Sequence, residues 1–263
     1  MRALPKGSAA AVSKSLRTYH GHAERDRAMD ALYGRFLAPG DLAFDIGAHV
    51  GDRVSSFRRL GARVVALEPQ PGPARAIRLI HGRDLAVTVL AAAAGDAEGE
   101  ITLHVNSANP TVSTASGDFV RAAHGAGGWE GQDWETAIAV PCLTLDGLIR
   151  AHGLPRFVKI DVEGFEDRVL MGLTRPIQAL SFEFTTIARD VAERCLDRLA
   201  ALGFAGFDVA LGETQRLTFE RWVSADAMAA HLAALPHDAN SGDVYAVIAP
   251  NAFAHPGLTT GIP

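Results

Sequence analysis

The chain has little of several features that mark particular protein classes. It carries two cysteines, Cys142 and Cys195, and neither belongs to a CxxC pair, so a disulfide framework is excluded. It has no apolar run near the ~20 residues that span a bilayer. Positive charge is also scarce, because 25 Lys and Arg stand against 30 Asp and Glu. This balance disfavours binding to a phosphate backbone. We therefore expect neither a nucleic-acid partner nor a membrane partner.

What the chain does have is the composition of a globular protein. Apolar residues make up 48% and charged residues 21%, which excludes a disordered chain. Charges repeatedly interrupt residues 1–27, so no secretory signal is expected there. Together with the scarcity of cysteine, this predicts a cytoplasmic protein.

Strands and helices are predicted to alternate along the chain. Short apolar runs at 41–46, 63–67 and 86–91 predict buried strands, and helices are predicted between them at 51–60 and 71–80. Such units with short connections imply a parallel sheet with right-handed crossovers. Further strands are predicted at 100–105, 137–143, 156–161, 178–185, 204–209 and 243–248, and further helices at 22–38, 144–151, 165–172 and 190–202. The sequence therefore predicts an α/β fold with a doubly wound, mostly parallel sheet.

The chain shows no internal repeat and no linker, so we expect one main domain. Residues 41–250 form this domain, residues 1–40 precede it as an N-terminal helical extension, and residues 251–263 follow as a flexible tail. The N-terminal helical arm is also a candidate surface for forming a homo-oligomer.

The most informative segment is FDIGAHVG, residues 44–51. A strand that runs into a glycine turn and then a helix is where a doubly wound sheet binds a nucleotide-like ligand. The pattern DxGxxxG lacks the GxGxxG of a dinucleotide site and the Lys-Ser/Thr pair of a P-loop. Asp45 at the strand end would repel a pyrophosphate but attract a cationic amino-acid head group or a sulfonium. This favours S-adenosylmethionine over NAD or ATP, although Asp45 could instead cap the turn.

Two further segments are predicted to border the same pocket. Glu68-Pro69 ends the second strand, about 20 residues beyond the loop, where an acid can accept hydrogen bonds from both ribose hydroxyls. NAD sites share this acid, and a solvated strand end is the alternative. After the third strand, small alanines leave room for an adenine, and Asp96 is a candidate partner of its amino group or a turn residue before Gly99.

A second signature, VKIDVEGFE, places several ionisable residues at one strand end. Lys159 and Asp161 share a face because side chains alternate along a strand. This strand should adjoin the first, so the cluster should lie beside Asp45, and clustered carboxylates in a cleft are functional candidates. Asp161 could approach the methyl donor or the substrate, and Glu163 could act as a base. Alternatively, Lys159 pairs with an acid and Glu163 caps the next helix.

Taken together, FDIGAHVG, ALEPQP, TLDGL and VKIDVEGFEDRVLMGL resemble the FkbM-type family of S-adenosylmethionine-dependent methyltransferases. The resemblance covers about residues 41–185, with weaker support to 249. It implies a seven-stranded class I methyltransferase fold and S-adenosylmethionine as cofactor. It also implies methyl transfer, usually to a hydroxyl oxygen of a sugar or secondary metabolite, which would make the chain an O-methyltransferase acting on a small molecule.

The resemblance also implies roles for individual residues. The predicted cofactor site comprises Asp45, Gly47, Ala48, Gly51, Glu68, Pro69, Asp96 and Asp161, and the predicted catalytic set comprises Asp161, Glu163 and His49. His49 is a departure, because the family more often has Asn there. The exchange is neutral if either side chain only donates a hydrogen bond, which we favour, or it supplies an imidazole near the transferred methyl.

The long segment 106–136 is predicted to be a functional loop or a disordered insert. Within it, Trp129 and Trp134 could form a lid or a wall for the acceptor, and His124 is another candidate base. No spacing of the ten histidines suggests a metal cage. We therefore predict no metal site.

Two other functions remain open from the sequence. A non-catalytic S-adenosylmethionine-binding protein would keep the same loop, and an NAD-linked oxidoreductase could use a similar sheet, although GxGxxG is absent. The sequence names neither the acceptor, nor the atom methylated, nor the general base.

Overall fold

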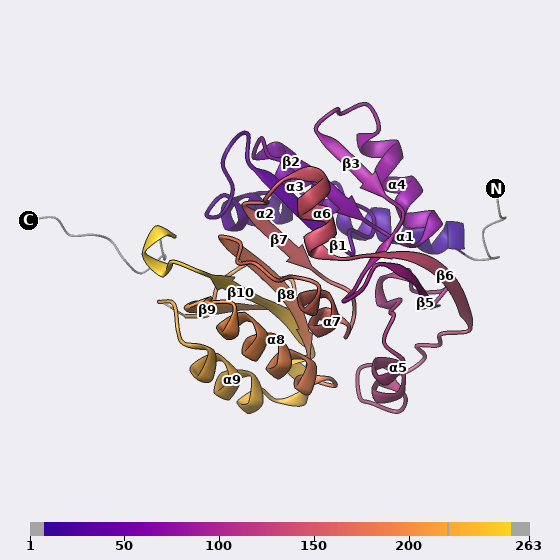
Figure 1. Cartoon of the computed structure of the whole chain (residues 1–263). Helices are drawn as coiled ribbons and strands as arrows, with labels where there is room; N and C mark the ends of the chain where they lie inside the picture. The colour runs from indigo at the N-terminus through magenta and orange to yellow at the C-terminus, as the bar shows by residue number, and fades with distance from the viewer. Residues whose placement is uncertain (1–7, 220, 254–263) are drawn as a thin grey trace, which may run out of the picture.

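A seven-stranded sheet organises the molecule. The computed structural model describes residues 8–219 and 221–253 (Figure 1), so the predicted tail lies mostly outside the described residues. The strands of the main sheet are β1 (Leu42–Ile46), β2 (Arg63–Leu67), β3 (Val87–Leu90), β7 (Phe157–Ile160), β8 (Ala179–Thr185), β9 (Gly206–Leu211) and β10 (Ser241–Val247).

The strand order is β3-β2-β1-β7-β8-β10-β9. All neighbours are parallel except β10, which runs antiparallel to both β8 and β9. The order turns back between β1 and β7, which is the switch point where doubly wound sheets bind ligands. The predicted doubly wound, mostly parallel fold of seven strands is therefore confirmed, and so is the predicted pairing of the first strand with the strand that carries Lys159.

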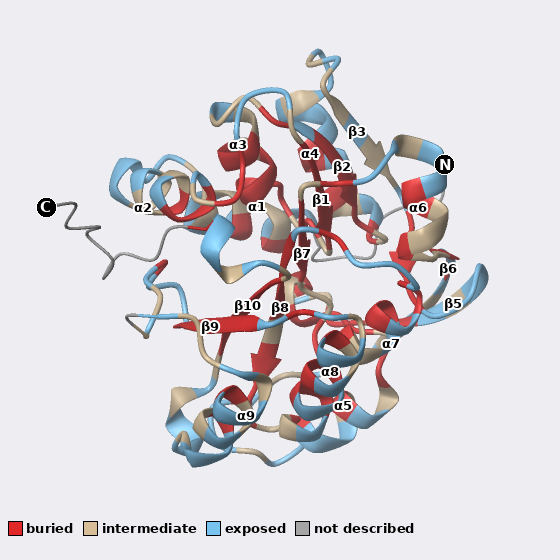
Figure 2. Ribbon diagram, turned by 60° about the vertical axis from the view of Figure 1, so that its left-hand side comes forward, coloured by how far each residue is buried: buried red, intermediate tan, exposed pale blue. Residues whose placement is uncertain are grey.

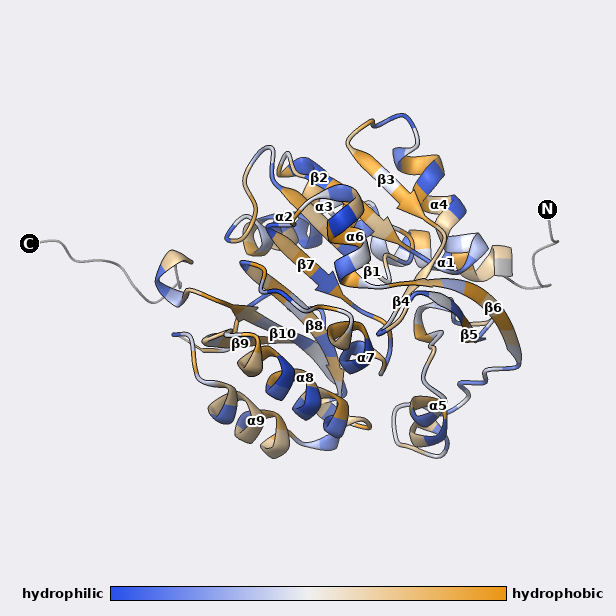
Figure 3. Ribbon diagram, viewed as in Figure 1, coloured by the Kyte–Doolittle hydropathy of each residue, from blue (hydrophilic) through white to orange (hydrophobic). Residues whose placement is uncertain are grey.

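Helices cover both faces of this sheet. The helices are α1 (Ser8–Tyr19), α2 (Ala23–Tyr33), α3 (Asp52–Arg59), α4 (Pro71–His81), α5 (Gly117–Ala123), α6 (Leu145–His152), α7 (Glu166–Met171), α8 (Arg189–Ala201) and α9 (Ala225–Ala234). One hydrophobic cluster joins the sheet to α2, α3 and α4, and another joins the opposite face to α6, α7, α8 and α9. Figure 2 shows the buried strands between these layers, and Figure 3 shows hydrophobic residues along the same strands.

Apolar spacing explains how the helices dock. In α8, Val191, Cys195, Leu196 and Leu199 recur at helical spacing, and all are buried against the sheet. Cys195 is 0% exposed, so it is a core residue as its spacing indicated. Helix α9 was not predicted, because its alanine-rich sequence ADAMAAHLAA shows weak periodicity; it docks through Met228 and Leu232.

A smaller sheet lies beside the main one. Its strands are β4 (Ala93–Ala94), β5 (Gly99–Val105) and β6 (Thr136–Leu143), in the order β4-β6-β5. The predicted strands 100–105 and 137–143 therefore pair with each other, outside the main sheet. The segment between them is not structureless: it contains the 3-10 turn η1 (Pro110–Val112) and α5, and its Trp129 is buried in a hydrophobic cluster.

The N-terminal helices are packed against the body of the protein. From α2 and the turn after it, Met29, Tyr33 and Phe36 are buried in the cluster that also holds Phe57 of α3 and Phe157 of β7. The hydrophobic packing is therefore continuous across residue 40, where the predicted N-terminal extension meets the main domain. Among the described residues, the structure contains no helix of the length and apolarity needed to cross a membrane.

Candidate active site

The glycine turn after β1 is shaped by backbone that favours glycine. Gly47 and Gly51 have φ of 83° and 82°, and His49 between them also has a positive φ of 46°. A Cβ on Gly47 would lie 1.8 Å from the backbone oxygen of Asp161, so only glycine allows the turn to touch the end of β7. The amides of Gly47 and Ala48 donate to the Leu67 oxygen at 3.0 and 2.9 Å. These contacts fix the turn to both neighbouring strands.

Glu68 lies buried at the end of β2 and holds this turn from the other side. Its carboxylate accepts hydrogen bonds from the amides of His49 at 2.9 Å and Gln70 at 2.7 Å. Burial raises the pKa of Glu68 to about 8, although both hydrogen bonds act in the opposite direction. The carboxyl group is therefore poised to change its charge near neutral pH.

Glu68 borders a small cavity of about 70 Å³ at the switch point. The walls come from the glycine turn, the end of β2, the alanines before and within β4, the insert, and the end of β7. The lining includes Gly47, His49, Glu68, Pro69, Gln70, Ala92, Ala93, Ala94, Thr111, Asp161 and Phe165. Gln70 is held in place by the Pro110 oxygen at 2.9 Å and the Ser113 hydroxyl at 3.1 Å. The segment 106–136 therefore covers the part of the cavity where the ribose and adenine are predicted to bind.

A larger cavity of about 250 Å³ adjoins the first. Four residues line both: Gly47, His49, Thr111 and Asp161. The larger cavity also receives side chains from α1, α3, the insert, β8 and the segment before α9. Trp129 forms part of its wall, whereas Trp134 lines neither cavity and donates to the Val112 oxygen.

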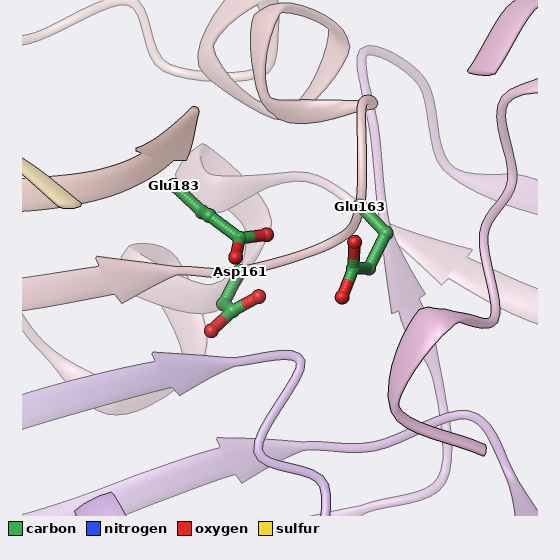
Figure 4. A group of neighbouring side chains, drawn as sticks. All are labelled: Asp161, Glu163 and Glu183. Atoms are coloured by element: carbon green, nitrogen blue, oxygen red, sulfur yellow. The ribbon is translucent and has the colours of Figure 1, made fainter. Parts of the chain in front are cut away.

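Three carboxyl groups converge in the larger cavity. Asp161 and Glu163 follow β7, and Glu183 comes from β8; one carboxylate oxygen of each lies within 4.8 Å of the others (Figure 4). Burial and then the neighbouring Asp161 raise the pKa values of Glu163 and Glu183 well above their usual range. Burial would also raise the pKa of Asp161, but Lys159 lowers it below its ordinary value. The cluster therefore combines one acid whose pKa is lowered with two whose pKa values are raised.

Lys159 is buried and has two acidic partners. Its Nζ lies 3.1 Å from Asp161 Oδ2 and 2.7 Å from Asp243 Oδ1, and its side chain is 1% exposed. The expectation that Lys159 and Asp161 share a face is thus confirmed, and so is the alternative that Lys159 pairs with an acid. The Lys159 charge is engaged by these two carboxylates, so it anchors the cluster to β10.

Asp45 lies next to this group at the end of β1. It is 2% exposed, and its Oδ2 has no hydrogen-bond partner within residues 8–219 and 221–253. Burial, followed by the nearby Asp52, raises the pKa of Asp45 to about 7. A buried carboxylate oxygen without a hydrogen-bond partner destabilises the fold unless a ligand donates a hydrogen bond to it.

An ion-pair network joins the N-terminal helices to the larger cavity. Arg25 of α2 and Arg53 of α3 both contact Asp52 Oδ2, at 2.7 and 2.6 Å, and both contact Glu213. Burial alone would raise the pKa of Asp52, but the two arginines hold it far below its usual range. Asp52, Arg53 and Glu213 line the cavity, as does Tyr19 of α1. The helical arm therefore contributes a wall of the site.

His49 connects the turn to the insert and to α1. Its Nε2 lies 3.4 Å from Thr111 Oγ1, and the ring of Tyr19 packs edge-on at 5.8 Å between centroids. Burial lowers the pKa of His49 to about 4, so the imidazole is neutral at neutral pH. This places a neutral ring where the two cavities meet.

The structure does not bring every predicted residue to the cavities. Asp96 lies on a different cleft, where its carboxylate pairs with Arg168 at 2.5 Å, so the expected approach to an adenine is not seen. Gly51 begins α3 and packs on Ile77 without lining either cavity. His124 follows α5 on the exposed surface. By contrast, Ala48 and Pro69 each line one of the two cavities.

Sequence reasoning missed several lining residues: Tyr19, Asp52, Arg53, Gln70, Thr111, Thr185 and Glu213. Gln70 follows Glu68-Pro69 directly, so extending that motif by one residue would have found it. The others lie in five separate segments with no shared spacing. Only the fold brings them together.

Comparisons with known proteins agree with this arrangement. A family model described as the methyltransferase FkbM domain matches residues 45–209. A search of curated protein sequences finds no match. Among solved structures, the chain is similar to a precorrin-6y C5,15-methyltransferase from Geobacter metallireducens, at 14% identity over 84% of this chain and 87% of that chain, with a TM-score of 0.44. It is also similar to an S-adenosylmethionine-dependent O-methyltransferase from Thermotoga maritima, at 13% identity over 92% of this chain and 71% of that chain, with a TM-score of 0.41.

The family match carries the assignment, and the weak structural likenesses add nothing to it. The matched segment begins at Asp45 and includes Glu68, Asp161 and Glu163. Because it spans more than half of the 263 residues, the chain belongs to the family of FkbM methyltransferase domains, and S-adenosylmethionine is its methyl donor.

Proposed function

We propose that this methyltransferase acts on a hydroxyl oxygen of a small molecule, such as a sugar or a secondary metabolite. The observation that carries the proposal is the pair of adjoining cavities, which share Asp161 and His49. A donor in the smaller cavity and an acceptor in the larger one would meet where the shared residues lie. Alignment of the two reactants supplies much of the rate enhancement in a displacement of this kind.

We propose that the donor spans the smaller cavity and the adjoining part of the larger one, which Asp45 and Ala48 line. Asp45, with its buried and unpartnered oxygen, fits the cationic amino-acid head group, and Glu68 fits the ribose hydroxyls. Gly47, Ala48 and Pro69 supply backbone and small side chains around them. Gly51 supports the turn from outside, and Asp96 is left out of this set. When bound, S-adenosylmethionine supplies an electrophilic methyl group on a sulfonium.

The carboxylates of the larger cavity suit proton removal from an alcohol. Asp161 is kept ionised by Lys159 and is placed to accept a hydrogen bond from the acceptor hydroxyl. We assign Glu163 to take the hydroxyl proton, because it faces Asp161 in this cavity and a raised pKa makes its ionised form a stronger base. We assign His49 to hold the turn and the insert together, because burial keeps its pKa low and its basicity weak.

The test is release of S-adenosylhomocysteine against a panel of sugars and polyketide alcohols, with the methyl position in the product located by mass spectrometry. Asp45→Ala should lose donor affinity by about a hundredfold, because truncating one partner of a buried charge pair costs 2–5 kcal/mol. Asp118→Ala is the control, since Asp118 is exposed on the insert and pairs with Arg121.

Three outcomes contradict parts of the proposal. Unchanged donor affinity in Asp45→Ala shows that the donor is held elsewhere. Methyl transfer to nitrogen or carbon only removes the hydroxyl assignment. Donor binding without turnover on any acceptor favours a non-catalytic binding protein.

A further inference from the structure

Two of the three acids in the larger cavity, Glu163 and Glu183, lack a positively charged partner. Glu163 is 6% exposed, and Glu183 Oε2 is buried with no hydrogen-bond partner in the described part of the chain. Neither forms an ion pair with the described residues. Lys159 is engaged by Asp161 and Asp243, and Arg53 by Asp52 and Glu213. Buried carboxylates without a cationic partner are destabilising unless a ligand or protons compensate.

A separate feature of the same cavity also points to a ligand. Thr185 is 4% exposed, lines the cavity, and its Oγ1 has no hydrogen-bond partner among residues 8–219 and 221–253. It lies two residues after Glu183 on β8, so both side chains project from one face of the strand. Glu183 Oε2 and Thr185 Oγ1 are therefore two unpartnered oxygens on one face of β8, and both side chains line the cavity.

The spacing of these oxygens suits one metal ion. One carboxylate oxygen from each of Asp161, Glu163 and Glu183 lies within 4.8 Å of the other two, and the three groups point toward one another in Figure 4. Oxygens that share a hard cation at about 2.1–2.5 Å lie at most about 4–5 Å apart. A donor set made only of oxygen favours Mg²⁺, Mn²⁺ or Ca²⁺ over zinc or copper.

We propose that Asp161, Glu163 and Glu183 bind a divalent cation of the Mg²⁺ or Mn²⁺ type, with Thr185 facing the same space. This departs from the expectation of no metal site, which considered histidine and cysteine spacing only. Glu183 is 20 residues from Glu163 in sequence and is brought beside Asp161 by strand pairing, so no local spacing marks the three acids as one ligand set. His20 and His22, which form an HxH pair in the sequence, contact backbone oxygens of Val50 and Arg17.

The inference rests on the proposed function, in which the cation would activate the acceptor hydroxyl. A bound cation coordinates the acceptor oxygen and lowers the pKa of that hydroxyl. Glu163 binds through one carboxylate oxygen and takes the hydroxyl proton on the other. The O–H bond breaks, the oxygen forms a bond to the methyl carbon, and the electron pair of the broken C–S bond remains on sulfur. No oxidant or reductant is required.

Binding of Mn²⁺ to the metal-stripped full-length chain tests the site without using activity. Electron paramagnetic resonance counts bound Mn²⁺, and quenching of Trp129 fluorescence reports an ion in this cavity, because Trp129 lines it. We expect one Mn²⁺ per chain, displaced by excess Mg²⁺. Glu183→Gln and Glu163→Gln should each weaken binding by at least about tenfold, since affinity follows the number of charged ligands.

The matched control is Glu193→Gln, because Glu193 is exposed on α8. It should leave Mn²⁺ affinity unchanged. Circular dichroism checks the folding of each variant, and Thr185→Val offers a second probe that keeps all charges. Absence of Mn²⁺ binding at millimolar concentration, or equal binding in Glu183→Gln, Glu163→Gln and the parent chain, overturns the proposal.

Turnover measured with and without a chelator separates this inference from the proposed function. Hydroxyl methylation that survives complete metal removal overturns the role of the cation and leaves the proposed function standing. Stoichiometric Mn²⁺ binding that depends on Glu163 and Glu183, without methylation of any hydroxyl, supports the site and removes the proposed acceptor.

Discussion

The two adjoining cavities are built in different ways. The smaller one depends on backbone: a glycine turn with positive φ, amides that donate to Leu67 and to Glu68, and small alanines. The larger one depends on charged side chains from segments far apart in sequence, such as Arg53, Glu183 and Glu213. The backbone geometry of a turn is determined by a few adjacent residues, which appear in the sequence as a motif. A cluster of charged side chains forms only when distant strands and helices pack together. The backbone features of the smaller cavity were therefore readable from sequence, whereas several residues of the larger cavity, such as Tyr19, Arg53 and Glu213, were not.

The largest effect is expected where backbone shapes the smaller cavity. In Gly47→Ala, the new Cβ would meet the Asp161 oxygen at 1.8 Å, so the turn must move away from β7. We expect donor binding to be lost and the free energy of unfolding to fall by about 3 kcal/mol. Calorimetric titration and denaturant unfolding measure the two quantities.

Gly40→Ala is the matched control for this clash. Gly40 also has a positive φ, of 91°, but a Cβ there meets nothing within 4 Å. Gly40→Ala should lower the free energy of unfolding by about 1–2 kcal/mol through backbone strain alone, and it should keep donor binding. Equal behaviour of the two variants would show that strain, and not contact with β7, makes glycine necessary at position 47.

The next largest effect is expected at Lys159, whose positive charge balances two acids at the larger cavity. Lys159→Met leaves Asp161 and Asp243 without their shared cation, so we expect a loss of about 3–5 kcal/mol of unfolding free energy. Adding Asp243→Asn should recover part of this loss, because one uncompensated acid is removed. A double-mutant cycle by urea unfolding measures the coupling. Additive losses would mean that the buried ion pair carries no coupling.

A pH effect is expected from Glu68, a titratable group of the smaller cavity. Its pKa of about 8 means that the cofactor-free folded chain holds a proton that the unfolded chain releases at lower pH. Its contribution to stability is therefore present at low pH and is lost as pH rises through 8. Ribose hydroxyls that donate to Glu68 favour the ionised form, so donor affinity should rise about tenfold from pH 7 to pH 9.

The measurement is calorimetric titration in buffers of different ionisation enthalpy, which counts the proton released on donor binding. Glu68→Gln should bind more weakly and lose this proton release. Asp45, with a pKa of about 7, contributes a separate step at lower pH that the variant keeps. An unchanged proton count in Glu68→Gln would assign the whole effect to other groups.

The smallest effect is expected at His49, which borders both cavities. Asn also tolerates the positive φ of this position and can bond to Thr111, so His49→Asn should change kcat by less than about threefold. A loss of a hundredfold with unchanged donor affinity would instead make the imidazole catalytic. Steady-state kinetics together with donor titration distinguish the two cases.

The sequence alone determined the alternation of strands and helices that builds the sheet, and it predicted the donor residues. Alternating apolar runs and glycine stops predicted most strands of the main sheet, and DxGxxxG with Glu68 predicted the donor pocket. These features depend on neighbours in sequence, through strand burial, turn geometry and the parallel pairing of β1 with β2 and β7. Helix α9 escaped because its alanine-rich sequence carries little periodicity, and Asp96 was misjudged because its partner, Arg168, lies on another element.

Only the tertiary structure decided what surrounds the larger cavity. Pairing of β7 with β8 brings Glu183 beside Asp161, docking of α1 and α2 adds Tyr19 and Arg25, and folding of the insert adds Trp129. None of these contacts has a fixed spacing in sequence, because each depends on how separate elements pack. Burial then shifts the acids: it raises the pKa values of Glu163 and Glu183, whereas Lys159 lowers that of Asp161.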